Sequence, residues 1–200
     1  FVNPSINKLD INTDEIERDA SQFDYPTENS FKDKPLINSE NWLEELKSLN
    51  IRYVLVTTPE QKDRYKQINM AKENGLKLIK AIHPSALIMN DAIIGDNVIM
   101  HAKSFVGYRS EISSGTIIDT NSQIDHHNVI KECVTINPGV VTAGNVTIEK
   151  FAKVHTGAII INRKTIGENS ILGAGTVIIK NVPANVTVVG VPGKIIKSSE

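Results

Sequence analysis

The stretch from Ile124 to Ile148, IDHHNVIKECVTINPGVVTAGNVTI, carries the pattern that decides the fold. Starting at Ile124, every sixth residue of this stretch is aliphatic except one; these residues are Ile124, Ile130, Ile136, Thr142 and Ile148. The same count runs without a gap from Ile82 to Ile178, and Thr142 is its one polar member. Four residues after each member comes a mostly small or β-branched residue, a rule from which Asn128 and Lys164 depart.

A period of six excludes an amphipathic helix, because a helix with about 3.6 residues per turn would spread these positions around its whole surface. The period is typical of a β-solenoid, in which each unit of six residues forms one short flat segment and one turn. The sequence therefore predicts a mainly β structure for the C-terminal part of the chain.

The sequence before residue 80 differs in composition, since none of the 12 glycines precedes Gly75. Helical patterns at 41–49, with Ser39 as expected N-cap, and at 60–74 alternate with strand-like runs at 51–58 and 76–82. Helices and strands that alternate at these lengths predict a small α/β layer with parallel strands. We therefore expect a partial, Rossmann-like α/β domain over residues 1–80 and a β-helix domain over residues 81–200.

Charge and cysteine content narrow the classes of partner. The 22 basic and 23 acidic side chains leave a formal net charge of −1, which disfavours nucleic acid and anionic membranes as partners. No apolar run is long enough to cross a bilayer. The single cysteine, Cys133, excludes an intrachain disulfide and favours a cytoplasmic location. No metal is expected either, because His126 and His127 are adjacent and no other pair of histidines is close in sequence.

The six-residue period between Ile82 and Val182 resembles that of the hexapeptide-repeat, left-handed parallel β-helix. The resemblance implies a triangular prism with 18 residues per coil, so that residues 18 apart stack at the inter-strand spacing. One expected column at a prism corner is His83, His101, Asp119, Asn137, His155. A second is Asn90, Tyr108, His126, Gly144, Asn162, Lys180. The left hand is implied by the resemblance alone.

Four motifs resemble a narrower group, the bacterial UDP-4-amino-sugar N-acetyltransferases and the sialic acid O-acetyltransferase-like proteins. They are IHPSALI at 82–88, IDHHNVI at 124–130, NPGVVTAGNVTI at 137–148 and VVGVPGK at 188–194. The resemblance implies an acetyltransferase that uses acetyl-CoA and a small-molecule sugar acceptor. It also implies a homotrimer whose sites lie between the prisms.

The resemblance assigns roles to individual residues. His126 matches the family's general base, and imidazole is suited to that role near neutral pH. Gly144, one coil further on, would leave room for the thioester, and its N–H could serve the oxyanion. Family contacts with acetyl-CoA map to Thr156 and Ala174, which are 18 residues apart, and a family histidine near acetyl-CoA maps to Thr135.

The chain departs from the family in several places. The carboxylate that usually follows the catalytic histidine is replaced by His127, and a family asparagine is replaced by Asp119. Either Asp119 or Asp125 takes over the carboxylate's role of orienting His126, or the rate is low, and of these we expect Asp119 to take the role. The family's glycine-rich nucleotide-sugar turn has no counterpart before Gly75, so that either the chain begins after this turn or the acceptor differs.

Two alternatives to an amino-sugar N-acetyltransferase follow from these residues. The first is O-acetylation of a sialic-acid-like sugar or another small hydroxylated acceptor. The second is a non-catalytic β-helix that serves as a binding or assembly protein, in which the departures at Asp119, His127 and Thr135 reflect lost activity.

Overall fold

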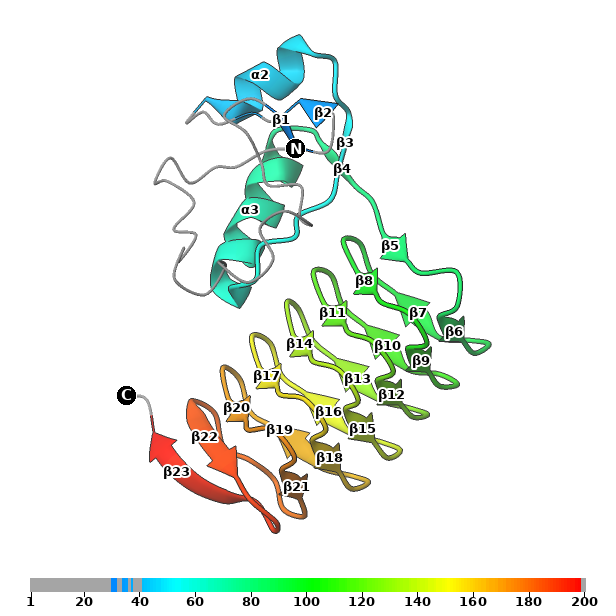
Figure 1. Ribbon diagram of the computed structural model, residues 1–200, viewed down its shortest axis with the longest axis vertical. Coiled ribbons are helices and arrows are strands. Elements are labelled where there is room, and N and C mark those ends of the chain that lie inside the picture. Colours follow the sequence, from blue (N-terminus) through cyan, green and yellow to red (C-terminus); the bar gives the residue numbers. More distant parts are fainter. Residues whose placement is uncertain (1–29, 32–33, 36, 38–40, 199–200) are drawn as a thin grey trace, which may run out of the picture. The chain divides into compact units, whose positions relative to one another are not determined.

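The computed structural model describes residues 30–31, 34–35, 37 and 41–198, and the chain divides into two compact units, 1–52 and 53–200 (Figure 1). In the first unit, β1 (Ser30–Phe31) pairs antiparallel with β2 (Lys34–Pro35). Helix α2 (Trp42–Ser48) follows, with Asn41 as its N-cap and Leu46 buried. The expected N-cap, Ser39, lies outside the described residues.

From β5 to β21 the second unit is a parallel β-solenoid built from strands of two residues (Figure 1). Its first face contains β5 (Ala81–Ile82), β8 (Ile99–Met100), β11 (Ile117–Ile118), β14 (Thr135–Ile136), β17 (Lys153–Val154) and β20 (Ile171–Leu172). Its second face contains β6 (Leu87–Ile88), β9 (Phe105–Val106), β12 (Gln123–Ile124), β15 (Val141–Thr142), β18 (Ile159–Ile160) and β21 (Val177–Ile178). Its third face contains β7 (Ile93–Ile94), β10 (Glu111–Ile112), β13 (Val129–Ile130), β16 (Thr147–Ile148) and β19 (Thr165–Ile166).

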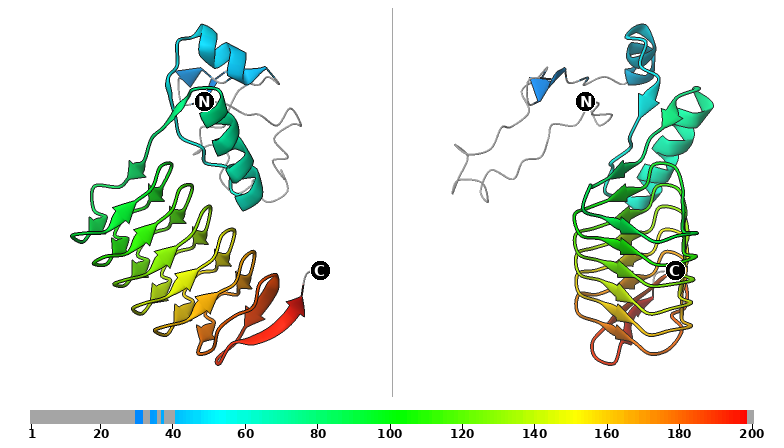
Figure 2. Two further views of the ribbon diagram at one scale, coloured as in Figure 1. Left: turned by 180° about the vertical axis from the view of Figure 1, so that it is seen from behind. Right: turned by 90° about the vertical axis from the view of Figure 1, so that its right-hand side faces the viewer.

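The strand register confirms a coil of 18 residues. Glu111 pairs with Val129 and Ile112 with Ile130 on the third face, and the other faces advance by the same step. Figure 2 shows the resulting stack of coils. The second residue of each two-residue solenoid strand points inward. From β8 on, these residues have at most 2% of their surface exposed. The residues at the predicted six-residue spacing therefore line the interior of the solenoid. There they stack as aliphatic ladders that supply the hydrophobic stabilisation.

The chain passes from the first face to the second at the first corner, from the second to the third at the second corner, and from the third back to the first at the third corner. At every corner from Asp91 to Gly175 one residue in six adopts a left-handed conformation, with φ between 53° and 74°. Most of these residues are not glycine. The glycine pattern alone therefore marked few of the corners.

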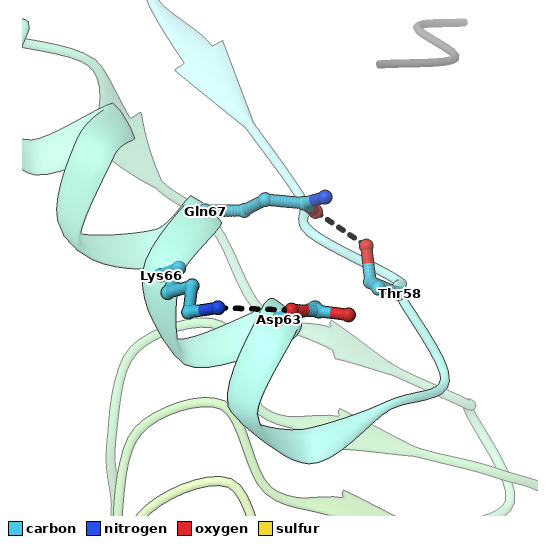
Figure 3. Close-up of polar contacts among 4 residues, drawn as sticks. All are labelled: Thr58, Asp63, Lys66 and Gln67. Atoms are coloured by element: carbon cyan, nitrogen blue, oxygen red, sulfur yellow. Dashed lines mark hydrogen bonds and ion pairs between the residues drawn. The ribbon is translucent and has the colours of Figure 1, made fainter. Parts of the chain in front are cut away.

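Helix α3 (Gln61–Glu73) runs along the third corner. The N–H groups of Gly75 and Leu76 donate to the carbonyls of Lys72 and Ala71, which confirms the predicted glycine stop of this helix. Thr58 donates to the Gln67 side chain and Lys66 pairs with Asp63 (Figure 3). The Thr58–Gln67 bond fastens α3 to the segment that precedes it, and the Lys66–Asp63 pair lies within the helix.

Strand β3 (Tyr53–Val54) pairs parallel with β4 (Lys77–Leu78), as the α/β pattern predicts. The predicted domain boundary at residue 80 lies inside the second compact unit, because α3 contacts the solenoid. At the other end, β22 (Val186–Val189) extends the first face and pairs antiparallel with β23 (Lys194–Ser198). Among the described residues no helix is long and apolar enough to span a membrane.

Candidate active site

The second corner carries His126 and His127 in the turn between β12 and β13. The Asp125 carboxylate accepts the backbone N–H of His126 at 2.7 Å, and Asn145 donates its N–H to the His126 carbonyl at 3.0 Å. The N–H of His127 donates to the carbonyl of Tyr108, one coil before. These bonds fix the backbone of the turn while both imidazole rings stay exposed.

Gly144 stacks directly on His126, as the predicted column requires. A Cβ on Gly144 would lie 2.3 Å from Cε1 and 2.6 Å from Nε2 of the His126 ring, well inside van der Waals contact. The space that the missing side chain leaves is therefore occupied by the imidazole itself. Gly144 is required at this position for the His126 ring to have this orientation.

His127 is the direct partner of the His126 ring. The two Nδ1 atoms are 2.9 Å apart and the rings are nearly perpendicular, at 87°. In this hydrogen bond one Nδ1 donates its hydrogen and the other accepts it. The His127 ring also contacts Tyr108 edge to face at 5.7 Å, and the Arg109 guanidinium lies 4.9 Å from the Tyr108 ring centre.

Asp119 lies at the first corner, across the second face from His126. Its carboxylate accepts the N–H of Thr120 at 2.7 Å within its own turn. Within one chain it does not reach His126, because the β12 segment separates the two corners. The expectation that Asp119 orients the base is therefore not met inside a single chain, and His127 has the position to do so.

Thr156 and Ala174 also lie at the first corner, stacked on one another. The N–H of Gly175 donates to the Thr156 carbonyl at 2.9 Å, and both Thr156 and Ala174 are exposed. In the neighbouring column Asn137 bonds to Nδ1 of His155 at 3.2 Å, and burial together with the nearby Lys153 lowers the pKa of His155. The residues predicted from the sequence therefore occupy two corners that flank the second face.

Thr135 is the exception. It lies on the first face beneath α3, with 8% of its surface exposed. Its hydroxyl accepts hydrogen bonds from Arg64 at 3.0 Å and Gln61 at 3.4 Å. Direct contact between Thr135 and a cofactor is not supported, because helix α3 covers the side chain.

The third corner is occupied by Arg64, which the sequence pattern did not single out. Its buried guanidinium donates to the carbonyls of Thr58, Pro59, Gly115 and Cys133, at 2.7 to 3.0 Å. Burial raises the pKa of the Cys133 thiol beside it, so that Cys133 has a packing role. Among residues 41–198 and the few described before them, no group of three or more His, Cys, Asp or Glu side chains could hold a metal.

Comparison with known proteins gives no matching family model. Among curated proteins, the serine acetyltransferase of Buchnera aphidicola subsp. Schizaphis graminum is 32% identical over 124 residues, which cover 58% of this chain and 40% of that protein. A 2,3,4,5-tetrahydropyridine-2,6-dicarboxylate N-acetyltransferase of Clostridium perfringens is 32% identical over 131 residues, or 62% of this chain and 56% of that protein. The chain thus spans about half, or less, of the length of these curated relatives.

Several solved structures match most of the chain. PerB from Caulobacter crescentus, solved with CoA and GDP-perosamine, has a TM-score of 0.82 and 28% identity, covering 84% of this chain and 81% of PerB. The acetyltransferase domain of PglB from Neisseria gonorrhoeae, solved with acetyl coenzyme A, has a TM-score of 0.80 and 31% identity, covering 87% of this chain and 84% of that domain.

Proposed function

Because the chain belongs to the hexapeptide-repeat acyltransferases, whose fold is the left-handed parallel β-helix, we propose that it transfers an acetyl group from acetyl-CoA to the amine of a nucleotide-linked amino sugar. The similarity to PerB and to the PglB domain supports the donor and the class of acceptor. The observation that carries the proposal is His126, an exposed imidazole seated on Gly144 with its Nδ1 engaged by His127.

His126 acts as the general base through Nε2, the nitrogen that remains after Nδ1 has bonded to His127. Acetyl-CoA, when bound, supplies the thioester carbonyl that the acceptor amine attacks. Nε2 takes one proton from the attacking amine and gives a proton to the departing sulfur as the C–S bond breaks. An amide and a free thiol result, and His126 returns to its starting form.

His127 holds His126 in the correct tautomer. If Nε2 is to accept a proton, Nδ1 of His126 must carry its hydrogen and donate it to Nδ1 of His127. His127 remains an acceptor after His126 has become an imidazolium, so it stabilises the charged state. This is the role that a carboxylate plays in the related motif, performed here by the imidazole of His127.

The residues around His126 fit a thioester. Because Gly144 has no side chain, the His126 ring lies against it, and in the proposed reaction the Gly144 N–H donates to the thioester carbonyl oxygen as that oxygen gains negative charge. Thr156 and Ala174 form a ladder of short exposed side chains at the first corner, which suits an extended pantetheine arm.

A homotrimer would bring the two corners together. The outward residues of the second face are largely apolar, and Leu87, Val141 and Ile159 are 56%, 40% and 44% exposed. We infer that three copies bury this face around a three-fold axis. The second corner of one copy then meets the first corner of the next, so that His126 faces Asp119, Thr156 and Ala174 of a neighbouring subunit.

The proposal also includes the cellular location and the acceptor group. Acetyl-CoA and nucleotide-linked sugars are cytoplasmic metabolites, which supports a cytoplasmic enzyme, as does the lone buried thiol of Cys133. An amine acceptor is favoured over a hydroxyl because the solved neighbours include a perosamine N-acetyltransferase.

Release of free CoA tests the activity directly. The protein is incubated with acetyl-CoA and a panel of nucleotide-linked amino sugars, free amino sugars and sialic-acid-like hydroxylated sugars. We expect thiol release with a nucleotide-linked amino sugar, and loss of it in His126→Ala. Thiol release with hydroxylated acceptors alone would mean that the protein is an O-acetyltransferase and not an N-acetyltransferase. No thiol release with any acceptor, together with no acetyl-CoA binding by calorimetry, would mean that the protein is a non-catalytic binding protein.

Val141→Asp tests the trimer, because it places a charge in the middle of the exposed apolar face. We expect light scattering to show trimers for the wild type and monomers for the variant, with loss of activity. Thr147→Asp is the matched control, since Thr147 is the outward residue at the neighbouring strand of the third face. A monomeric wild type with full activity would refute the shared site.

A further inference from the structure

The two polar residues that break the six-residue pattern near His126 contact one another inside the solenoid. Thr142 is the single polar member of the aliphatic count, and Asn128 stands where neighbouring coils have valine or serine. Both are buried, with exposed fractions of 1% and 0%. The Asn128 side-chain amide donates to the Thr142 hydroxyl oxygen at 2.8 Å. Fourteen positions apart in sequence, the two departures form one buried pair.

This pair holds the residue that precedes His126 from the inside. The Asn128 amide donates to the Asp125 carbonyl at 2.8 Å, and the Thr142 oxygen accepts the Asp125 N–H at 3.3 Å. Both polar groups of the Asp125 backbone are thus bonded to the buried pair. The Asp125 carboxylate in turn binds the backbone N–H of His126.

The second corner is held more firmly here than other corners are. In the repeating arrangement one buried hydroxyl donates to a corner carbonyl of the next coil, as Ser122 does to Asn137 at 2.9 Å and Thr116 to Lys131 at 3.1 Å. The Asp125 carbonyl accepts that bond, from Ser110 at 2.6 Å, and a further one from Asn128. The extra bonds coincide with the corner that carries the His126 turn.

The same pair also extends to the coil that carries Gly144. The Asn128 side-chain oxygen accepts the N–H of Val146 at 2.5 Å, and Thr142 is two residues before Gly144. The pair therefore couples the backbone under His126 to the backbone on which its ring rests. Aliphatic residues at both positions would satisfy the solenoid, as they do in other coils, so that core packing alone does not account for the pair.

We propose that Asn128 and Thr142 are positioning residues that keep the His126 ring seated on Gly144 with Nδ1 directed at His127. This inference rests on the proposed role of His126 as the base. Asn128 and Thr142 do not touch the reacting atoms. They act through the Asp125 backbone.

The double variant Asn128→Val/Thr142→Val restores the repeat and removes both polar groups together. Removing both leaves neither member of the pair without the other, while the backbone N–H groups of Asp125 and Val146 lose their side-chain acceptors. We expect a folded protein whose thermal midpoint is lowered by roughly 5 to 15 °C. We expect kcat to fall by about tenfold or more with KM for acetyl-CoA changed less than about twofold. Thr116→Val is the matched control, because it removes a buried hydroxyl from the third corner, and its kcat should not change.

Imidazole ¹⁵N NMR separates this inference from the proposed function. The wild type should show His126 protonated at Nδ1, and the folded double variant should show averaging of the two tautomers. If kcat and the tautomer are both unchanged in the folded double variant, the positioning role is wrong. If the wild type acetylates no acceptor but the variant still loses the fixed tautomer, the positioning role stands and the proposed function fails.

Discussion

Gly144→Ala is the sharpest perturbation of the candidate active site. The added Cβ would lie 2.3 Å from Cε1 of His126, whereas ordinary contact begins at 3.4 Å, so the ring must retreat by roughly 1.1 Å. The Gly144 backbone does not adopt a left-handed φ, and alanine therefore adds no backbone strain. His126 is exposed and can swing into solvent at little cost.

Activity should therefore fall while stability is kept. A displacement of about 1 Å at a reacting group costs about 100-fold in rate, so we expect kcat to fall by about that factor. We expect the free energy of unfolding to change by less than about 0.5 kcal/mol. Steady-state thiol release and urea denaturation measure the two quantities on the same protein.

A double-mutant cycle provides the control. In the His126→Ala background the clash is gone, so adding Gly144→Ala should have no further effect on residual activity. The reasoning is refuted if Gly144→Ala alone keeps kcat within about twofold of the wild type. That result would mean that the ring does not need the space above Gly144.

Three further predictions concern other parts of the second unit. Arg64→Ala should lower the free energy of unfolding by about 3 kcal/mol, measured by urea denaturation, because it removes the charged donor from several buried carbonyls; Arg64→Lys should not restore it, since one ammonium cannot reach them all. Cys133 should react with a thiol reagent at pH 8 only after unfolding. Burial raises the pKa of the Cys133 thiol, so the thiol's contribution to the free energy of unfolding is present at neutral pH and lost as pH rises through the alkaline range. Cys133→Ala should abolish this pH dependence. His127→Phe should lower kcat by about tenfold or more with little change in KM, because it removes the acceptor for Nδ1 of His126; an unchanged kcat would contradict the orienting role.

The repeat made the solenoid predictable because its geometry is local. Strand pairs, corner turns and the interior ladder follow from a strict period of six, and the coil of 18 stacks Gly144 on His126. The helix at 61–73 and its stop at Gly75 were predictable for the same reason. Roles assigned by column position were less secure, as Thr135 shows, because a column does not reveal what covers it.

The sequence by itself determined the columns of the prism and the corner that carries His126, because a regular period converts spacing into stacking. Tertiary structure decided which corner residues meet. Contacts between coils and with α3 depend on side chains distant in sequence, such as Arg64 with Thr135 or Asn128 with Thr142. The orientation of His126 by His127, the separation of Asp119 from it within one chain and the polar pair beneath it therefore appeared only in three dimensions.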